Sequence, residues 1–158
     1  MQKHYYIAYG SNLNIRQMRW RCPGARIIGT TELKGWKLLF KGSKTGSYLT
    51  IEREEGFSVP AAVWEVTEQD ERALDRYEGF PDFYYRKDLE VDITGIRSGR
   101  VRRRTAFVYI MHEERRVGIP SHGYVMTCLE GYRDFGFDTA PIIEACEHSR
   151  EVVNSETR

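Results

Sequence analysis

The sequence predicts an α+β fold in which a mostly antiparallel β-sheet curls or closes, with helices beside it. Most of the chain consists of short β-type runs separated by short turns. Helical patterns appear in only a few places, two of them at the C-terminal end. With 158 residues, of which 41% are hydrophobic and 30% charged, the chain suits one domain. We expect a single domain over residues 1–150 and a polar tail over residues 151–158.

The N-terminal stretch predicts a strand, a sharp turn and the start of a helix. Residues 4–9 are aromatic and apolar, Gly10-Ser11-Asn12 is typical of a turn, and a short helix is expected over residues 15–21. Such a connection places several unpaired backbone N–H groups together, and Gly10 has no Cβ to keep a ligand away. The residues alone leave an ordinary connection without a ligand open as well.

The middle of the chain predicts a run of strands. We expect a polar loop over Gly42–Ser47 and a turn at Glu54-Glu55-Gly56. The strands expected around them are Ala25–Leu33, Gly35–Phe40, Leu49–Arg53 and Val59–Val66.

The second half predicts a helix, a hairpin and two further helices. Thr67 can cap a helix that ends at Gly79, just before Pro81. The hairpin strands are expected at Phe83–Ile93 and Arg102–Met111, and the two helices at Tyr124–Phe135 and Thr139–Arg150.

Composition excludes several function classes. The net charge of +1 gives no general attraction to nucleic acid or to an anionic membrane. We interpret the basic run Arg97–Arg104 as an exposed hairpin tip, although an anionic partner stays open. Cys22, Cys128 and Cys146 are far apart, which favours a reducing compartment over a zinc or disulfide framework. Without a signal-peptide pattern or a bilayer-length apolar run, a cytoplasmic protein is expected.

Glu78 is the candidate acid/base residue. It lies at the predicted C-terminal end of a helix, where the negative end of the helix dipole disfavours a carboxylate. That field, together with burial, would raise the pKa of Glu78, as a general base near neutral pH requires. A solvated glutamate on a frayed helix end is the alternative.

Three motifs give the chain a resemblance to a known family. They are Tyr9-Gly10-Ser11-Asn12-Leu13 after an aromatic strand, Leu74-Asp75-x-x-Glu78-Gly79, and Pro120-Ser121-x-x-Tyr124. The sequence thereby resembles the γ-glutamylcyclotransferase superfamily, which includes the AIG2-like proteins. The resemblance implies a small closed or partly closed β-barrel flanked by helices. It also implies that the Tyr9–Leu13 loop binds a γ-glutamyl group through backbone N–H groups, that Glu78 is the acid/base, and that Tyr124 lines the pocket.

The resemblance also implies a reaction. The α-amine of a small γ-glutamyl substrate attacks its own γ-carbonyl carbon, which gives 5-oxoproline and a free amine and needs no metal, cofactor or enzyme nucleophile. The glutathione-specific branch has another residue at the position of Asn12, and the branch acting on γ-glutamyl-lysine lacks the full Gly-Ser-Asn-Leu pattern. An enzyme that removes a γ-glutamyl protecting group from a biosynthetic intermediate stays open. The sequence carries no pattern that predicts the leaving amine or an oligomeric state.

Two other function classes compete with the cyclising enzyme. A non-catalytic AIG2-like interaction module would keep the fold, and the presence of a carboxylate at position 78 argues against it. A serine hydrolase would use Ser11, but no G-x-S-x-G motif surrounds that serine. His112-Glu113-Glu114 lacks the second histidine of a zinc-binding helix motif.

Overall fold

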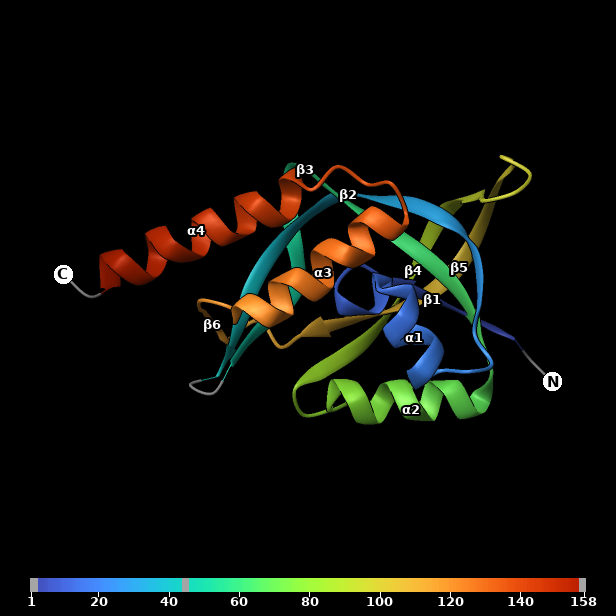
Figure 1. Ribbon diagram of the computed structural model, residues 1–158, viewed down its shortest axis with the longest axis horizontal. Helices are drawn as coiled ribbons and strands as arrows, with labels where there is room; N and C mark the ends of the chain where they lie inside the picture. Colours follow the sequence, from blue (N-terminus) through green and yellow to red (C-terminus); the bar gives the residue numbers. More distant parts are fainter. Residues whose placement is uncertain (1–2, 44–45, 157–158) are drawn as a thin grey trace.

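A closed β-barrel forms the centre of the computed structural model, which describes residues 3–43 and 46–156 (Figure 1). The neighbouring strands follow the order β3-β1-β5-β4-β2, and β2 pairs again with β3 to close the barrel. All these pairs are antiparallel except β1 with β5. The expected mostly antiparallel, closed barrel is therefore confirmed. Its strands are β1 (His4–Ala8), β2 (Arg26–Ser43), β3 (Gly46–Val66), β4 (Tyr84–Gly95) and β5 (Val101–Met111).

The strands β2 and β3 are longer than the sequence indicates. The four separate strands expected between residues 25 and 66 are two continuous ones, so the prediction of their ends was wrong. The pairing passes from Lys34–Ser58 to Trp36–Arg53, which makes the expected turn at 54–56 a bulge opposite Gly35. Gly35 and Gly56 have φ angles of 82° and 89°, so the chain bends there without ending either strand. Of the expected loop over residues 42–47, residues 44 and 45 lie outside the described part.

The helices begin and end close to the expected residues. A 3₁₀ turn, η1 (Ser11–Leu13), precedes α1 (Ile15–Arg21), and α2 covers Glu68–Glu78. In α2, Thr67 and Asp70 form a capping box, and Gly79 ends the helix in the left-handed conformation. A short strand, β6 (Arg116–Val117), pairs with β2 and was not expected. The later helices are α3 (His122–Asp134) and α4 (Ala140–Glu156).

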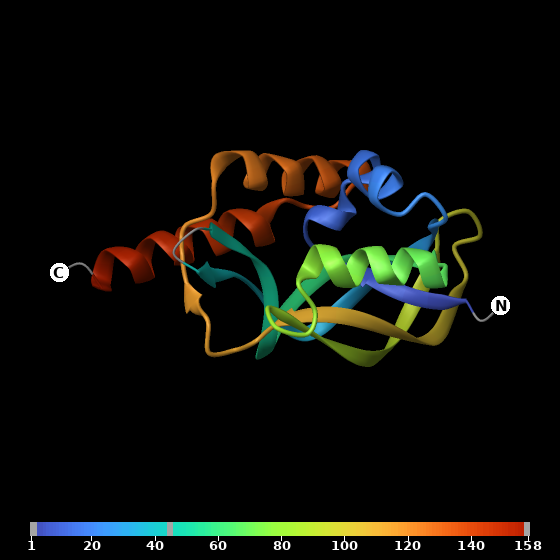
Figure 2. The same cartoon turned by 90° about the horizontal axis from the view of Figure 1, so that it is seen from below.

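The helices are unevenly distributed around the barrel. Figures 1 and 2 show α1 and α3 on the same side of it, while α4 runs out along β2. Residues 151–156, expected as a polar tail, continue α4, whereas residues 157 and 158 lie outside the described part. The beginning of β1 and the end of α4 lie at opposite ends of the molecule (Figure 1).

One continuous apolar core fills the barrel and the space beneath the helices. Ile7, Phe40, Ile51 and Trp64 are among its fully buried side chains, and Leu74 adds the inner face of α2. Burial of such side chains contributes about 1.5–3 kcal/mol each, which holds the strand ends in place.

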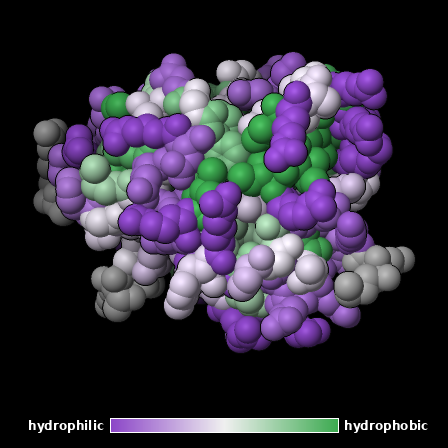
Figure 3. All heavy atoms as spheres, turned by 45° about the vertical axis from the view of Figure 1, so that its right-hand side comes forward, coloured by the Kyte–Doolittle hydropathy of each residue, from purple (hydrophilic) through white to green (hydrophobic). Residues whose placement is uncertain are grey.

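Hydrophilic side chains cover most of the face shown in Figure 3, around one compact apolar area. The basic run 97–104 covers the tip between β4 and β5 and the first residues of β5, and it is exposed as expected. Among the described residues, no helix has the length and hydrophobicity that crossing a membrane requires.

Candidate active site

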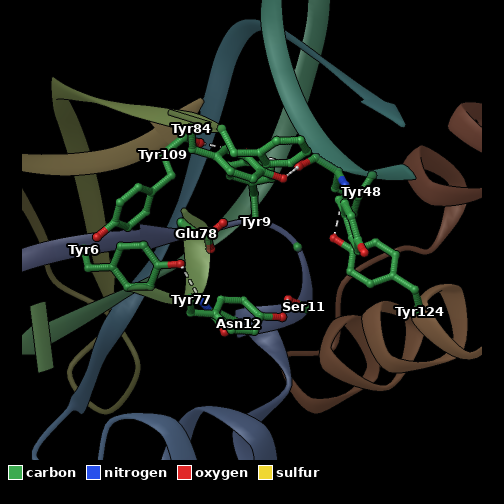
Figure 4. A pocket seen from close by; sticks show the side chains of 13 residues that line it. Tyr6, Tyr9, Ser11, Asn12, Tyr48, Tyr77, Glu78, Tyr84, Tyr109 and Tyr124 are labelled. Atoms are coloured by element: carbon green, nitrogen blue, oxygen red, sulfur yellow. Dashed lines mark hydrogen bonds between the residues drawn. The ribbon is translucent and has the colours of Figure 1, made fainter. Parts of the chain in front are cut away.

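A cavity of about 380 Å³ lies where η1, the end of α2 and the start of α3 meet the barrel (Figure 4). Aromatic side chains form most of its wall, and among the described residues Glu78 contributes the only carboxyl group to it. Its lining residues are Tyr6, Tyr9, Gly10, Ser11, Asn12, Tyr48, Leu49, Tyr77, Glu78, Phe83, Tyr84, Tyr109 and Tyr124.

Most of the residues singled out in the sequence line this cavity. Tyr9 to Asn12, Glu78 and Tyr124 come from three separate parts of the chain and share the wall. Leu13 is completely buried and does not line the cavity, so its side chain contributes to packing. That these residues bind a ligand or carry out chemistry stays a prediction.

The loop after β1 presents unpaired backbone donors. Because η1 is a single turn, its internal hydrogen bonds run only from Leu13 N to Gly10 O and from Asn14 N to Ser11 O, each 3.0 Å long. The N–H groups of Ser11 and Asn12 have no hydrogen-bond partner among the described residues. Two adjacent donors therefore remain available beside the cavity.

Helix α3 holds this loop from the other side. Asn14 is fully buried, accepts a bond from Gln17 N at 3.1 Å, and donates to Thr127 O at 3.2 Å and to Glu130. Gly131 faces the loop backbone, where a Cβ would lie 2.6 Å from Asn14 N. Only glycine permits this approach, so the loop is fixed in position by α3.

Glu78 lies at the last residue of α2 and points into the cavity (Figure 4). The helix ends there because Gly79 is left-handed (φ 64°) and Phe80 N donates to Asp75 O at 2.9 Å. Burial raises the pKa of Glu78 to about 8, and the nearby positive charge of Arg21 partly opposes that increase. The Glu78 carboxyl group makes no hydrogen bond or ion pair with the described residues. Among the described residues, the Glu78 carboxyl group is therefore left without a hydrogen-bonding partner on the cavity wall.

Neutral tyrosine hydroxyl groups surround Glu78. Burial is the main cause that raises the pKa values of Tyr6, Tyr9, Tyr84 and Tyr124 well above their ordinary value, so all four stay protonated. The Tyr84 hydroxyl donates to Leu49 O at 2.7 Å. Compared with these four tyrosines, Glu78 is the group whose pKa lies close to neutral pH.

Two residues outside the cavity wall, Arg21 and Asp75, support the site and were given no role in the sequence analysis. Arg21 donates to Asn12 Oδ1 and lies over the Tyr77 ring, with its guanidinium carbon 3.4 Å from the ring centre. Asp75 accepts hydrogen bonds from the Tyr109 hydroxyl at 2.6 Å and from Arg86 at 3.3 Å, which ties the last turn of α2 to the barrel. Asp75 was part of a quoted motif, but Arg21 carries no local pattern that would reveal it.

The geometry also bears on the competing chemistries. Ser11 Oγ lies 3.1 Å from the Tyr77 hydroxyl, and no histidine lines the cavity, so the serine-hydrolase arrangement is missing from the described residues. The described residues hold no group of three or more His, Cys, Asp or Glu side chains suited to a metal ion. All three cysteines are free.

Comparison with known proteins places the chain among related sequences and folds. The family model described as "Gamma-glutamyl cyclotransferase, AIG2-like" matches residues 6–126. A search of curated proteins returned no match. A structure named gamma-glutamyl cyclotransferase is 24% identical with a TM-score of 0.77, over 91% of this chain and 86% of that one.

Two further solved structures have the same fold. An uncharacterized protein from Homo sapiens is 25% identical with a TM-score of 0.77, over 92% of this chain and 87% of that one. A gamma-glutamyl cyclotransferase specific to glutathione from yeast is only 9% identical, with a TM-score of 0.63 over 96% and 97% of the two chains.

Proposed function

Since this chain belongs to the gamma-glutamyl cyclotransferase, AIG2-like family, we propose that it cyclises small γ-glutamyl amides to 5-oxoproline with Glu78 as general acid/base. The observation that carries the proposal is the position of Glu78. It is an unpaired carboxyl group of raised pKa, and the residues with unpaired backbone N–H groups, Ser11 and Asn12, line the same cavity. Catalytic carboxyl groups typically have perturbed pKa values of this kind.

In the proposed reaction, Glu78 removes a proton from the α-amino group of the substrate. The amine nitrogen then forms a bond to the γ-carbonyl carbon of the same molecule. As the bond from that carbon to the leaving nitrogen breaks, Glu78 returns the proton to the leaving nitrogen. The products are 5-oxoproline and a free amine, and no water or external nucleophile is consumed. Because the pKa of Glu78 is raised to about 8, both proton transfers are accessible near neutral pH.

The loop supplies the second requirement of this chemistry. The carbonyl oxygen gains negative charge as the ring forms, and fixed N–H donors stabilise such a charge strongly. The unpaired N–H groups of Ser11 and Asn12 are the proposed donors, and Asn14 and Gly131 hold them rigid. Since the reaction is intramolecular, folding the γ-glutamyl chain into a ring-like conformation is mainly a matter of positioning. The neutral tyrosine wall supports that role by enclosing the substrate without offering a competing base.

The test is direct measurement of the product. The purified protein is incubated with γ-glutamyl amino acids, γ-glutamyl monoamines, γ-glutamyl-lysine and glutathione, and released 5-oxoproline is quantified. We expect turnover of at least one compound and none by a Glu78→Gln variant. Absence of 5-oxoproline from every compound would contradict the proposed enzyme and leave the non-catalytic interaction module on the same fold.

A further inference from the structure

Arg21 occupies the junction between the loop and the helix that carries Glu78. It is the last residue of α1 and is half-buried. One terminal nitrogen donates to Asn12 Oδ1, the other lies 3.5 Å from Gln17 Oε1, and the guanidinium group stacks on the Tyr77 ring. A single side chain therefore contacts both the loop and the last turn of α2.

The contacts of Arg21 continue to the cavity wall. Asn12 Nδ2 donates to the Tyr6 hydroxyl at 2.9 Å, and the Tyr77 hydroxyl lies 3.1 Å from Ser11 Oγ. Asn12, Tyr77, Tyr6 and Ser11 all line the cavity, whereas Arg21 does not. Its influence on bound substrate is therefore indirect and passes through these neighbours.

The charge of Arg21 is not matched by a carboxylate. On the other side of α2, Arg86 pairs with Glu71 at 2.8 Å and with Asp75 at 3.3 Å. Among the described residues, Arg21 makes no such ion pair within 4.0 Å, and its charge acts on Glu78. Arg21 is also a cation near the negative C-terminal end of α2, a favourable arrangement.

We propose that Arg21 is a positioning residue, which locks Asn12 and Tyr77 against the cavity and holds one positive charge over the Tyr77 ring, next to Glu78 in the chain. The inference rests on the proposed function for its effect on rate. Its effect on Glu78 rests on the contact of Arg21 with Tyr77, the residue before Glu78, and on the charge of Arg21, which lowers the pKa of Glu78. A planar, permanently charged guanidinium group suits both tasks, since it can stack on a ring and donate at its edge at the same time. Lysine keeps the charge but cannot do both.

The other groups around Glu78 do not compete for this electrostatic role. Tyr6 and Tyr9 face it from β1 and the following turn, Tyr84 from β4 and Tyr124 from α3, and burial keeps all four neutral. Tyr77, from α2 itself, is covered by the guanidinium group. Removing the charge at position 21 should therefore raise the pKa of Glu78 further, and the ionised base should appear only at higher pH.

The experiment compares Arg21→Gln, Arg21→Lys and a matched control, Arg19→Gln. Arg19 lies in the same helical turn, is exposed and lines no part of the cavity. The Glu78 carboxyl carbon is followed by ¹³C NMR over pH in protein labelled at glutamate, and its signal is assigned by its loss in Glu78→Gln. Turnover, KM and the thermal midpoint are measured in parallel.

We expect the Glu78 titration in Arg21→Gln to move to higher pH together with the acidic limb of kcat/KM. In Arg21→Lys the titration should stay near that of the wild type while kcat falls about 10- to 100-fold, because the stacking and hydrogen-bonding geometry is lost. Arg19→Gln should match the wild type in all measurements.

Two results would overturn the inference. One is an Arg21→Gln protein with a lower thermal midpoint but an unmoved Glu78 titration, since a purely structural role predicts that pattern. The other is wild-type kcat in Arg21→Lys, which would remove the positioning role and decides the matter even if Arg21→Gln does not fold. If no γ-glutamyl compound is turned over, the proposed function fails, and the NMR titration still decides whether Arg21 acts on Glu78.

Discussion

Glu78→Gln separates the chemical role of this carboxyl group from its effect on stability. Glutamine has the same size and keeps one carbonyl acceptor, but it cannot take up a proton. General acid/base catalysis contributes about 10²- to 10⁴-fold to rate, so release of 5-oxoproline should fall by at least that factor. Substrate binding should be largely retained, because the backbone donors of the loop are unchanged.

The same substitution should stabilise the fold, and more so at alkaline pH. The pKa of Glu78 rises on folding from an ordinary 4.5 to about 8, so the folded protein favours the protonated form. The wild type therefore loses stability as pH rises from 4.5 through about 8, and the variant does not. At about 1.4 kcal/mol for each unit of pKa, the difference between the two proteins reaches at most about 5 kcal/mol. Water in the cavity reduces it, and we expect a gain on the order of 2 kcal/mol at pH 9 and almost none at pH 4.5.

The assay measures 5-oxoproline release at pH 7.5 and urea unfolding at several pH values, with Glu68→Gln as the matched control. Glu68 is exposed at the opposite end of the same helix, so that variant should keep wild-type turnover. Retained turnover in a folded Glu78→Gln protein would remove Glu78 from the mechanism. An equal stability difference at pH 4.5 and pH 9 would refute the reasoning from burial.

Three further predictions concern the surroundings of Glu78. Gly131→Ala should destabilise the protein by about 1–3 kcal/mol and impair turnover, because its Cβ would lie 2.6–2.7 Å from loop backbone atoms. The control is Gly123→Ala on the same helix, whose Cβ would meet nothing within 4 Å. We expect denaturation and turnover assays to show no change in that control. Tyr48 packs edge-on against Tyr124 and Phe83 at ring separations of 5.2 Å and 6.2 Å. Tyr48→Ala should therefore raise KM more for a γ-glutamyl amide with an aromatic tail than for γ-glutamyl-alanine. Equal changes in KM would show that the aromatic tail does not bind against these rings. Chelation with EDTA should leave turnover unchanged, since one carboxylate and no histidine or cysteine line the cavity, and recovery of lost turnover by a divalent ion would contradict this.

The sequence reveals the residues whose importance is local. A glycine after an aromatic strand, a capping threonine and a glycine that ends a helix are visible in the sequence, and the structure has the turn and α2 at those positions. The strand ends at 33–35 and 53–59 were not predictable, because glycines and charged residues mark a bulge and a turn equally well. Pairing with the neighbouring strand decides whether the chain stops or only bends at Gly35 and Gly56.

Residues whose contacts lie far away in the sequence could not be predicted either, because only the fold brings the two partners together. Arg21 looks like one of several exposed arginines of a short helix, and only the fold places it on Tyr77. The burial that raises the pKa of Glu78 likewise comes from side chains on several separate elements. A raised pKa was expected from the helix end and from burial, and burial is the cause that raises it in the structure.

The way α3 holds the loop has a consequence for the order of folding. Asn14 finds its acceptor Thr127 O 113 positions later in the sequence, and β1 pairs at Tyr6 with Phe107 of β5. Contacts of such long range form late, because the entropy of closing a long chain segment must be overcome first. During synthesis the cavity therefore cannot be completed until α3 has emerged, although the β2–β3 hairpin already has its partner. Formation of the cavity reports on the last stage of folding, so a slow-folding variant should recover its far-UV circular dichroism before it recovers any ability to bind ligand at this end of the barrel.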